Sequence, residues 1–518
     1  METREELIEE KKESNILNTL NCASLDGIKA KVISVEATFT KGLPGFAVVG
    51  LASSDIQEAK ERVKSALLTN NFTFPPLKIT VNLSPSDIRK SGSHFDLSLA
   101  LLIALNDTTI DEDGLYVFGE LGLDGRVKSS SMLFPIILSL KEQNLIKRAI
   151  VPKEAIEYLS FISGVDFIAV ETLLEAIDVI RYKKFQANTQ RFEYKAKSFD
   201  IDGKRYYYEK NYPSDFSDVK GQVVAKRAAL IASAGMHNFL MEGNPGCGKS
   251  MISKRLQYIL PPLSEEEILS IAKHQFLDGV VPDFRALRPM RSPHHTATSA
   301  SIFGGGSVSA KIGEVALAHY GVLFFDELPH FSKNVLEALR EPLQDRKVHI
   351  ARVNAKVEYD ADIMFISAQN PCPCGNLLSK TKECRCSEAD IKRYKNKLSD
   401  PFLDRIDIFV VMQEVSTQDS ADITSKQMHT MVIDAFKMQK QRGQQRLNGK
   451  LKEDEIDRYC ILSKEAQVVL ENAISRFGLS HRSIASIKKV ARTIADLNHH
   501  TDIEKKDILE ALSYRRRV

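Results

Sequence analysis

A glycine-rich segment near the middle of the sequence has the residue types and spacing of a loop that binds phosphate. The pattern G-x-x-x-x-G-K-S follows an apolar run at 239–241 and precedes a helix-like stretch, which is the context such a loop requires. Its glycines let backbone N–H groups surround phosphate oxygens, and the following helix N-terminus favours negative charge. The sequence therefore predicts a nucleoside-triphosphate site. The loop consists of Gly243, Asn244, Pro245, Gly246, Cys247, Gly248, Lys249 and Ser250.

Two adjacent carboxylates, Asp326 and Glu327, end another apolar run at 322–325. An apolar run that ends in Asp-Glu is common, so the pair gains meaning only together with the glycine-rich loop. We expect Lys249 to reach the β/γ-phosphates, and Ser250 and Asp326 to hold Mg²⁺. Glu327 would polarise the attacking water.

A side-chain amide, Asn370, follows a third apolar run at 364–368. If this run lies beside the other two in one sheet, the amide would reach the γ-phosphate or the attacking water. Alone, Asn370 would be an ordinary turn residue.

Four of the seven cysteines lie within fifteen residues, in the pattern C-x-C-x9-C-x-C. Four thiolates suit a structural Zn²⁺ and leave no open position for catalysis. The alternative is a loop with four reduced, metal-free thiols. The candidate ligands are Cys372, Cys374, Cys384 and Cys386.

These residues require α/β elements to position them. Strand-like runs at 238–242, 321–326 and 363–368 alternate with helical patterns, which favours a parallel sheet. Strands near 30–37, 46–49 and 77–83, with helices near 54–70 and 96–105, predict an earlier α/β domain. The whole chain is therefore of the α/β class. We predict a helical tail at 1–20, an α/β domain at 21–181, a linker at 182–213, a nucleotide-binding core at 214–413 and a helical domain at 414–518.

Length and composition exclude several classes of protein. The 518 residues suggest three or four domains, and 43% hydrophobic with 27% charged residues is typical of a globular chain. The formal net charge of +3 does not by itself indicate a nucleic-acid partner. A basic surface that binds nucleic acid would therefore have to be confined to one part of the protein. We find no signal peptide and no apolar run long enough to span a membrane. We therefore expect a cytoplasmic protein that has no membrane partner.

The ordered set of motifs resembles the AAA+ ATPases of the magnesium-chelatase/MCM-like branch, and more narrowly the ComM/YifB family. The resemblance covers nearly all of the chain past residue 20. It implies ATP as the nucleotide, Asn370 as sensor 1, Arg405 as an arginine finger for a neighbouring subunit and Arg482 as sensor 2. Arg405 in a surface salt bridge is the alternative. The motifs are 243–250, 291–296, 326–329, 370–375, 403–405 and Arg482.

The resemblance also implies a ring, expected to be a homo-hexamer, because an arginine finger completes the site of its neighbour. The chain departs from the family pattern at Asn244 and Cys247, where Pro and Thr are usual. Both are loop positions where the backbone acts, so we expect activity to survive. Cys247 would make the ATPase sensitive to oxidation or alkylation.

Two insertions predict contact with DNA. One holds Arg291; in the other, segments around 348–350 and 356–358 would pair as a hairpin with Arg352 near its tip and Lys356 beside it. In the family such insertions point into the pore of the ring, where basic side chains would meet phosphates. The alternative is a hairpin that only stabilises subunit contacts.

The front domain resembles the Lon protease fold. Proteolysis there requires a Ser–Lys dyad, but the nucleophile position falls at His94 and the lysine position near Phe134. We therefore expect a Lon-protease-like domain without proteolytic activity.

The family resemblance implies an ATP-dependent DNA motor, a helicase that drives branch migration of recombination intermediates, including those of natural transformation. Its partners would be single-stranded or branched DNA, copies of the chain itself and recombination proteins. The alternative is an ATP-driven subunit of magnesium-chelatase or chaperone type that remodels a protein.

Overall fold

The computed structural model of the protein describes residues 18–108, 110, 114–188, 193–305, 311–351, 356–414 and 422–515, with 351 and 356 described by backbone alone. The predicted helical tail at 1–20 lies almost entirely outside this part. The chain divides into two compact units, residues 1–193 with 275–281 and residues 194–274 with 282–518.

The first unit is built on a mixed sheet of seven strands in the order β3-β4-β2-β1-β5-β8-β9. Side chains of β2 and β4 alternate between buried and more exposed positions. This alternation is typical of strands with one face on a core. The expected strands and helices of this region are confirmed. The strands of this sheet are β1 (Asn18–Asp26), β2 (Lys29–Thr40), β3 (Gly45–Val49), β4 (Lys78–Ser84), β5 (Leu115–Val117), β8 (Arg148–Pro152) and β9 (Asp166–Val170), and β6 (Glu120–Leu121) and β7 (Val127–Lys128) form a separate pair. The helices are α2 (Ser54–Thr69), α3 (Asp96–Ala104), α4 (Leu133–Glu142), α5 (Ile156–Leu159) and α6 (Leu173–Arg181).

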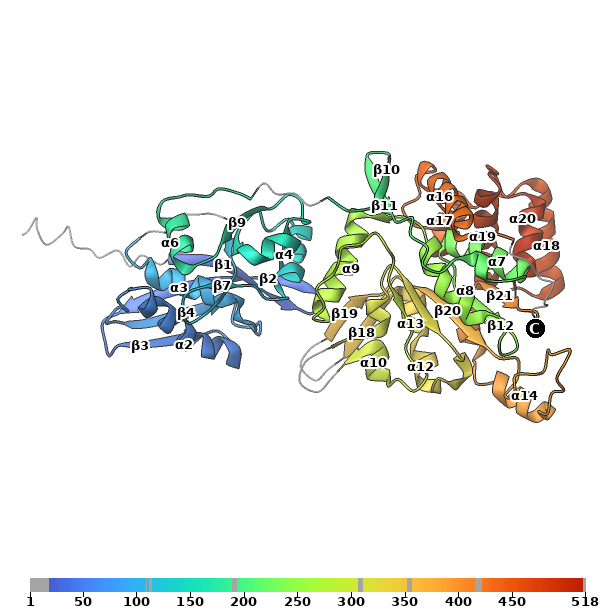
Figure 1. Ribbon diagram of the computed structural model, residues 1–518, viewed down its shortest axis with the longest axis horizontal. Helices are drawn as coiled ribbons and strands as arrows, with labels where there is room; N and C mark the ends of the chain where they lie inside the picture. Colours follow the sequence, from blue (N-terminus) through green and yellow to red (C-terminus); the bar gives the residue numbers. More distant parts are fainter. Residues whose placement is uncertain are drawn as a thin grey trace, which may run out of the picture. The chain divides into compact units, whose positions relative to one another are not determined.

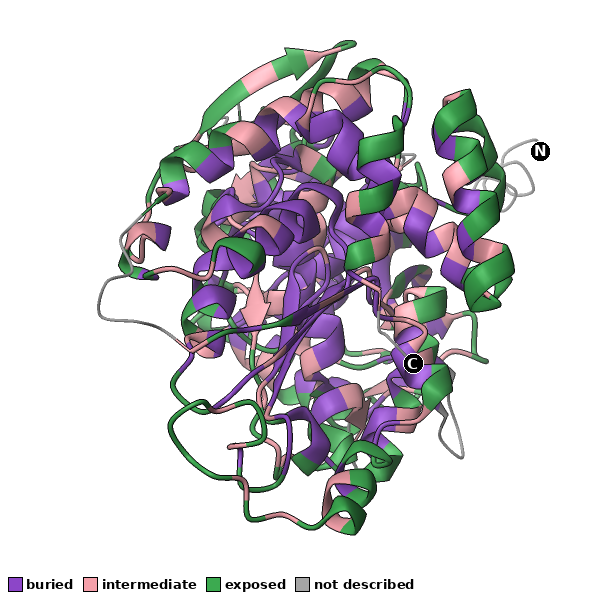
Figure 2. Ribbon diagram, turned by 90° about the vertical axis from the view of Figure 1, so that its right-hand side faces the viewer, coloured by how far each residue is buried: buried purple, intermediate pink, exposed green. Residues whose placement is uncertain are grey.

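The second unit contains a five-stranded sheet in the order β14-β17-β20-β12-β21, and all of its paired strands are parallel, as the sequence predicts. Every residue of β17 and β20 is buried, which explains why β17 is entirely apolar and why β20 is apolar except for Ser367 and Gln369. Figure 2 shows these strands in purple beneath helices with green outer faces. The strands are β14 (Met290–Arg291), β17 (Val322–Phe325), β20 (Met364–Gln369), β12 (Phe239–Glu242) and β21 (Ile408–Val411).

Helices follow and cover this sheet, and the last five form the predicted helical domain (Figure 1). One hydrophobic core joins the two parts, because Met241 of the sheet, Val432 of α16 and Val490 of α19 belong to the same buried cluster. The helical domain is therefore not an independent unit. The helices are α7 (Val223–Gly235), α8 (Lys249–Leu256), α9 (Glu265–Leu277), α10 (Ser299–Phe303), α11 (Glu314–Leu317), α12 (Lys333–Ala338), α13 (Arg340–Asp345), α14 (Glu388–Lys395), α15 (Asp400–Leu403), α16 (Ser425–Gln441), α17 (Glu453–Tyr459), α18 (Lys464–Phe477), α19 (His481–Leu497) and α20 (Lys505–Ser513).

The predicted linker at 182–213 needs a correction. Strands β10 (Lys197–Ile201) and β11 (Lys204–Tyr208) form a hairpin there, and β11 pairs with the short strand β13 (Leu263–Ser264). Tyr206 is buried against the ring of Phe436, with ring centroids 5.0 Å apart. The aromatic side chains that obscured a periodic pattern therefore belong to the folded second unit.

The second unit contains two further pairs of antiparallel strands. Strands β18 (Lys347–Ala351) and β19 (Lys356–Asp360) pair antiparallel, which confirms the expected hairpin, and β15 (Gly304–Gly305) pairs with β16 (Lys311–Ile312). Within the described ranges, none of the helices has both the length and the apolar character needed to cross a membrane.

Candidate nucleotide-binding site

The glycine-rich loop lies at the carboxyl end of β12, between that strand and α8. Strands β20 and β21 flank β12 on either side, so the loop follows an inner strand of the sheet. This is the position where open α/β sheets bind ligands. Gly246 and Gly248 adopt positive φ values of 81° and 98°, which glycine adopts without strain. The backbone can therefore curl around a phosphate group.

Lys249 is buried, and its ammonium group is held by the loop itself. It donates hydrogen bonds to the carbonyl oxygens of Gly243 and Asn244, at 2.5 and 3.0 Å, and to Oδ1 of Asn370 at 3.1 Å. Burial lowers the pKa of Lys249 from its ordinary value. The structure thus brings Asn370 beside the phosphate loop, and an incoming phosphate would replace these neutral acceptors with a charged one.

Ser250 and Asp326 lie together at the start of α8 and the end of β17. The Ser250 hydroxyl donates to Oδ2 of Asp326 at 2.9 Å. Hydroxyl and carboxylate oxygens are hard donors of the kind that Mg²⁺ prefers. The residues present therefore fit the expected ion.

Glu327, next to Asp326, has a left-handed backbone conformation with φ of 53°. Its N–H donates to Oδ1 of Asp326 at 2.9 Å, and its side chain is 49% exposed. Two imidazoles face its carboxylate: Nδ1 of His330 lies 3.4 Å and Nδ1 of His295 lies 3.8 Å from Oε2. Sequence reasoning gave His295 no ligand role, because no carboxylate or cysteine lies close to it in the sequence, and it did not consider His330.

Cys247 is 3% exposed, and burial raises the pKa of its thiol. A buried, protonated thiol reacts slowly with oxidants and alkylating agents. This contradicts the expectation that Cys247 makes the ATPase sensitive to such reagents.

Arg405 and Arg482 share one hydrogen-bond acceptor. Both donate to Oε1 of Gln344, at 2.7 and 3.1 Å. Burial, together with the nearby charges of Arg482 and Arg340, lowers the pKa of Arg405. Arg482 also lies in the first turn of α19, where a cation opposes the helix dipole. Gln344 therefore brings the two arginine side chains together.

The residues predicted to contact DNA differ in what the structure says of them. Arg291 forms a two-bond salt bridge with Glu314, with N–O distances of 2.5 and 2.9 Å, so its charge is already compensated within the chain. Arg352 lies outside the described residues, and Lys356 is described by its backbone alone.

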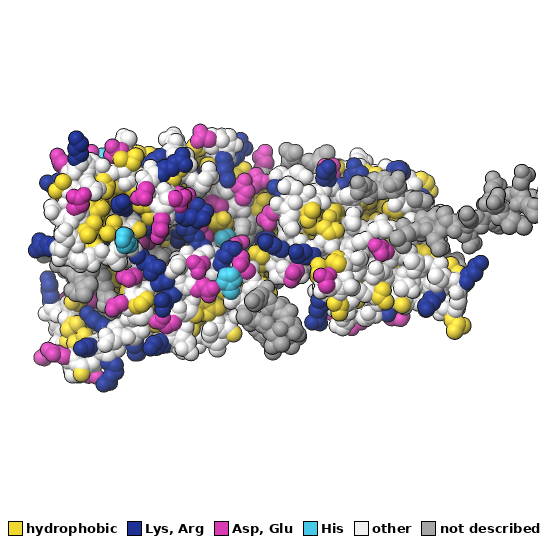
Figure 3. Space-filling model, turned by 180° about the vertical axis from the view of Figure 1, so that it is seen from behind, with side chains coloured by type: hydrophobic (Ala, Val, Ile, Leu, Met, Phe, Trp, Pro, Cys, Tyr) yellow, Lys and Arg dark blue, Asp and Glu magenta, His cyan; other side chains and the backbone are white. Residues whose placement is uncertain are grey.

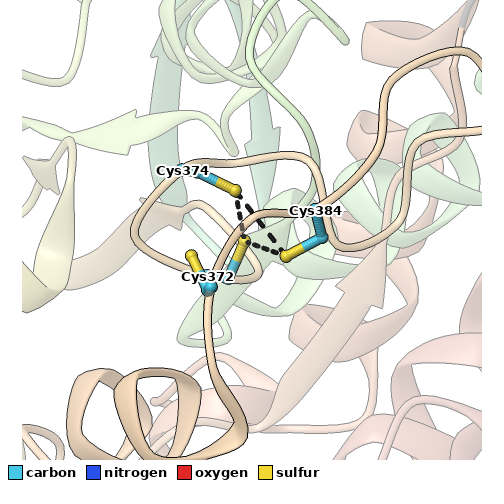
Figure 4. A group of neighbouring side chains, drawn as sticks. Cys372, Cys374 and Cys384 are labelled. Carbon is cyan, nitrogen blue, oxygen red and sulfur yellow. Dashed lines mark hydrogen bonds between the residues drawn. The ribbon is translucent and has the colours of Figure 1, made fainter.

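The four cysteines of the 372–386 loop converge. Figure 4 shows the sulfurs of Cys372, Cys374 and Cys384 turned toward one another. Their Sγ–Sγ separations are 3.5, 3.7 and 3.7 Å. The Sγ of Cys386 joins the group within 4.8 Å. Four sulfurs around Zn²⁺ at about 2.3 Å would be separated by about 3.8 Å. Backbone N–H groups of Asn376 and Arg385 lower the pKa of Cys374 to about 6. The thiols therefore fit a tetrahedral metal.

The cysteine loop also contacts the phosphate loop. A Cβ on Gly375 would lie 2.7 Å from ring atoms of Pro245, so only glycine allows this approach. Glu414 accepts hydrogen bonds from Asn244 Nδ2 at 3.1 Å, from Ser379 Oγ at 2.5 Å and from Lys380 N at 3.2 Å. The side chain of Asn244 is therefore in use, whereas the sequence suggested a purely backbone role at this position.

Comparison with known proteins agrees with this geometry. Family models described as "Magnesium chelatase, subunit ChlI", "Subunit ChlI of Mg-chelatase" and "Magnesium chelatase, subunit ChlI C-terminal" match residues 215–420, 35–155 and 422–515. The first covers the phosphate loop, both carboxylates and the cysteine loop.

Relatives match over almost their whole length. The chain is 36% identical over 503 residues to "Competence protein ComM" of Haemophilus influenzae, covering 95% of this chain and 96% of that protein. It is 34% identical over 505 residues to "Uncharacterized protein YifB" of Escherichia coli, covering 94% and 95%. The chain therefore belongs to the ComM/YifB family of magnesium-chelatase-like AAA+ ATPases.

Proposed function

We propose that the protein is an ATP-driven DNA motor that works as a homo-hexameric ring and drives branch migration of recombination intermediates, including those formed when DNA is integrated during natural transformation. The observation that carries the proposal is the match to a competence protein over 95% of the chain, which includes the first unit and the cysteine loop. Single-stranded or branched DNA would be its track, and recombination proteins its partners.

Residues of one chain would bind ATP and prepare its hydrolysis. Lys249 exchanges its carbonyl partners for the β/γ-phosphates, and Ser250 and Asp326 hold Mg²⁺, which neutralises charge on the phosphates. Asn370 accepts a hydrogen bond from Lys249 and would sense the γ-phosphate. Glu327 would accept a proton from the attacking water as that water bonds to the γ-phosphorus. The bond from the γ-phosphorus to the bridging oxygen would break at the same time, and ADP would leave with that oxygen.

The neighbouring chain would complete the site. In the described residues, the polar contacts of Arg405 and Arg482 are to Gln344, Arg340 and Pro401, none of which belongs to the phosphate loop. Because none of these hydrogen bonds goes to the phosphate loop of the same chain, the contacts support a role in trans for Arg405. Arg405 would stabilise the negative charge that develops on the transferred phosphoryl group.

Contact with DNA would be local. Figure 3 shows Lys and Arg side chains mixed with Asp and Glu over the face drawn, in line with a net charge of +3. The hairpin β18–β19 is the element that would carry Arg352 and Lys356 to the phosphates of the track. Arg291 would have to leave Glu314 before it contacted DNA.

The first unit would be a Lon-like domain without peptidase activity. His94 is 2% exposed and donates from Nε2 to the carbonyl of Ala23 at 2.9 Å, and Phe134 is fully buried. The adjacent Ser93 hydroxyl donates to Glu120, a carboxylate rather than a lysine. These contacts support a structural role for the domain.

An alternative is a motor that remodels a protein, because all three matching family models are named for a magnesium-chelatase subunit. ATP hydrolysis measured without DNA and with single-stranded, duplex or four-way-junction DNA separates the two, with Glu327→Gln as the blank. Strong stimulation by DNA that is lost in the variant supports the DNA motor. Hydrolysis that responds to unfolded protein and ignores every DNA would favour the alternative.

A further inference from the structure

A second group of metal-ligand side chains lies beside the nucleotide site. Ligand atoms of His295, Glu327 and His330 all lie within 4.8 Å of one another. Two of the separations involve Glu327 Oε2, which is 3.4 Å from Nδ1 of His330 and 3.8 Å from Nδ1 of His295. Tetrahedral ligands about 2.0–2.1 Å from a metal are separated by about 3.4 Å. The His330–Glu327 pair already has this spacing, and the His295–Glu327 pair is slightly wider.

The backbone holds the three residues in place. Glu327 and His330 are joined by one 3₁₀ turn (Leu328–His330), in which the His330 N–H donates to the Glu327 carbonyl at 2.8 Å. His295 follows β14, which pairs in register with β17, the strand that leads to Glu327. The ring of His295 packs edge-on against those of His330 and Phe331. The fold of the β14–β17 region therefore brings the three residues together.

The donor set distinguishes this cluster from the expected Mg²⁺ site. Two imidazoles and one carboxylate favour borderline cations such as Zn²⁺, whereas the oxygens of Ser250 and Asp326 favour Mg²⁺. The side chains are 31%, 49% and 43% exposed for His295, Glu327 and His330. An ion can therefore enter from solvent, and three ligands leave a fourth position open to water or a phosphate oxygen.

We propose that His295, Glu327 and His330 form a binding site for Zn²⁺ or a similar borderline divalent cation, and that occupation of this site inhibits ATP hydrolysis. Inhibition follows because Glu327, once it coordinates the cation, can no longer accept a proton from water. This second part rests on the proposed ATPase role of Glu327. The binding part depends only on the geometry.

The test measures Zn²⁺ binding by the full chain with Mg²⁺ present in excess, through titration calorimetry and metal content after dialysis. Variants His295→Ala, His330→Ala and Glu327→Gln each remove one ligand. His294→Ala is the matched control, because His294 is next to His295 in the chain but is not one of the three ligands. Its Nδ1 is hydrogen-bonded to Thr296 Oγ1 at 2.8 Å instead. The four cysteines are unchanged in the wild type and in all four variants. Any Zn²⁺ that the cysteine loop binds therefore adds equally to every measurement and does not affect the differences between them.

Wild type and His294→Ala should bind one more equivalent of Zn²⁺ than the three ligand variants. Loss of a ligand should weaken this equivalent at least about tenfold, since even outer-shell changes cost about 10- to 100-fold. Equal binding by wild type and the ligand variants would overturn the site and leave the histidines as simple neighbours of Glu327.

The second measurement is ATP hydrolysis at rising Zn²⁺ with constant Mg²⁺. Hydrolysis by wild type and His294→Ala should fall as the extra equivalent binds, and His330→Ala should need at least about tenfold more Zn²⁺ for the same relative loss. Binding without inhibition would overturn the inhibitory role alone. A chain that hydrolyses no ATP would refute the proposed function, while the binding comparison would still decide the site.

Discussion

The side-chain amide of Asn244, in the phosphate loop, donates a hydrogen bond to Oε1 of Glu414 at 3.1 Å. The same carboxylate accepts hydrogen bonds from Ser379 and Lys380 of the cysteine loop, and these lower the pKa of Glu414. One carboxylate thus joins the loop that binds nucleotide to the loop that gathers four thiols. Because its pKa is lowered, the charged form of Glu414 persists further into acid than that of an ordinary glutamate.

Glu414→Ala should weaken ATP binding roughly threefold, the scale of a single exposed hydrogen bond. Removal of the carboxylate frees Asn244 and lets the phosphate loop sample conformations that do not bind. A fluorescent ATP analogue titrated into each variant measures the effect. Glu383→Ala, an exposed carboxylate on the cysteine loop, is the control and should bind as wild type does. Equal affinities for the two variants would show that the bridge does not support the site.

If the cysteine loop holds Zn²⁺, as its four thiols allow, removal of the metal should also weaken ATP binding. Gly375 lies against Pro245, so a loop loosened by loss of Zn²⁺ no longer supports the phosphate loop. Cys384→Ser should lose one equivalent of zinc by metal analysis and bind the ATP analogue less tightly. Cys460→Ser changes a buried cysteine elsewhere and should keep the metal. Zinc retained by Cys384→Ser would contradict the four-thiol site.

Arg405→Ala should lower ATP hydrolysis about 10³-fold or more while ATP binding persists. If Arg405 serves the site of a neighbour, mixing this variant with Lys249→Ala should restore activity, because some interfaces then combine an intact Lys249 with an intact Arg405. The control mixture replaces the second partner with a Lys249→Ala chain that also carries Arg405→Ala. Two mixtures equally inactive would argue that Arg405 acts within its own chain.

Pattern reasoning located the strands that carry the predicted site because buried parallel strands are continuous apolar runs. It placed Asp326 and Asn370 at adjacent strand ends for the same reason. It could not find the contact between His295 and Glu327, since β14 has only two residues and its register depends on pairing with β17. The hairpin β10–β11 was not predicted, because its tyrosines and charged residues do not alternate regularly in the sequence. Its place in the fold depends on the packing of Tyr206 on Phe436, which the sequence does not show.

The first unit should lose stability in acid. Burial lowers the pKa of His94 to about 4, so between about pH 6.5 and 4 the unfolded chain binds a proton that the native chain does not. The free energy of unfolding should therefore decrease as the pH is lowered from about 6.5 to 4. The contribution of His94 to this decrease is at most about 3 kcal/mol. Thermal unfolding from pH 7 to 4.5 should show a smaller pH dependence for His94→Gln. The exposed His481→Gln is the control, and an unchanged slope in His94→Gln would contradict the expectation.

The hairpin β18–β19 makes the DNA proposal testable through salt. If Arg352 contacts a phosphate, Arg352→Ala should weaken binding to single-stranded DNA of any sequence and lower the slope of log affinity against log salt by about 0.7. Fluorescence anisotropy at several salt concentrations measures both. Lys347→Ala is the matched control, because Lys347 on the same hairpin is already paired with Glu358 and should release few counterions. Equal slopes in wild type and Arg352→Ala would move the hairpin from the DNA track to the subunit interface, the alternative that its sequence also allows.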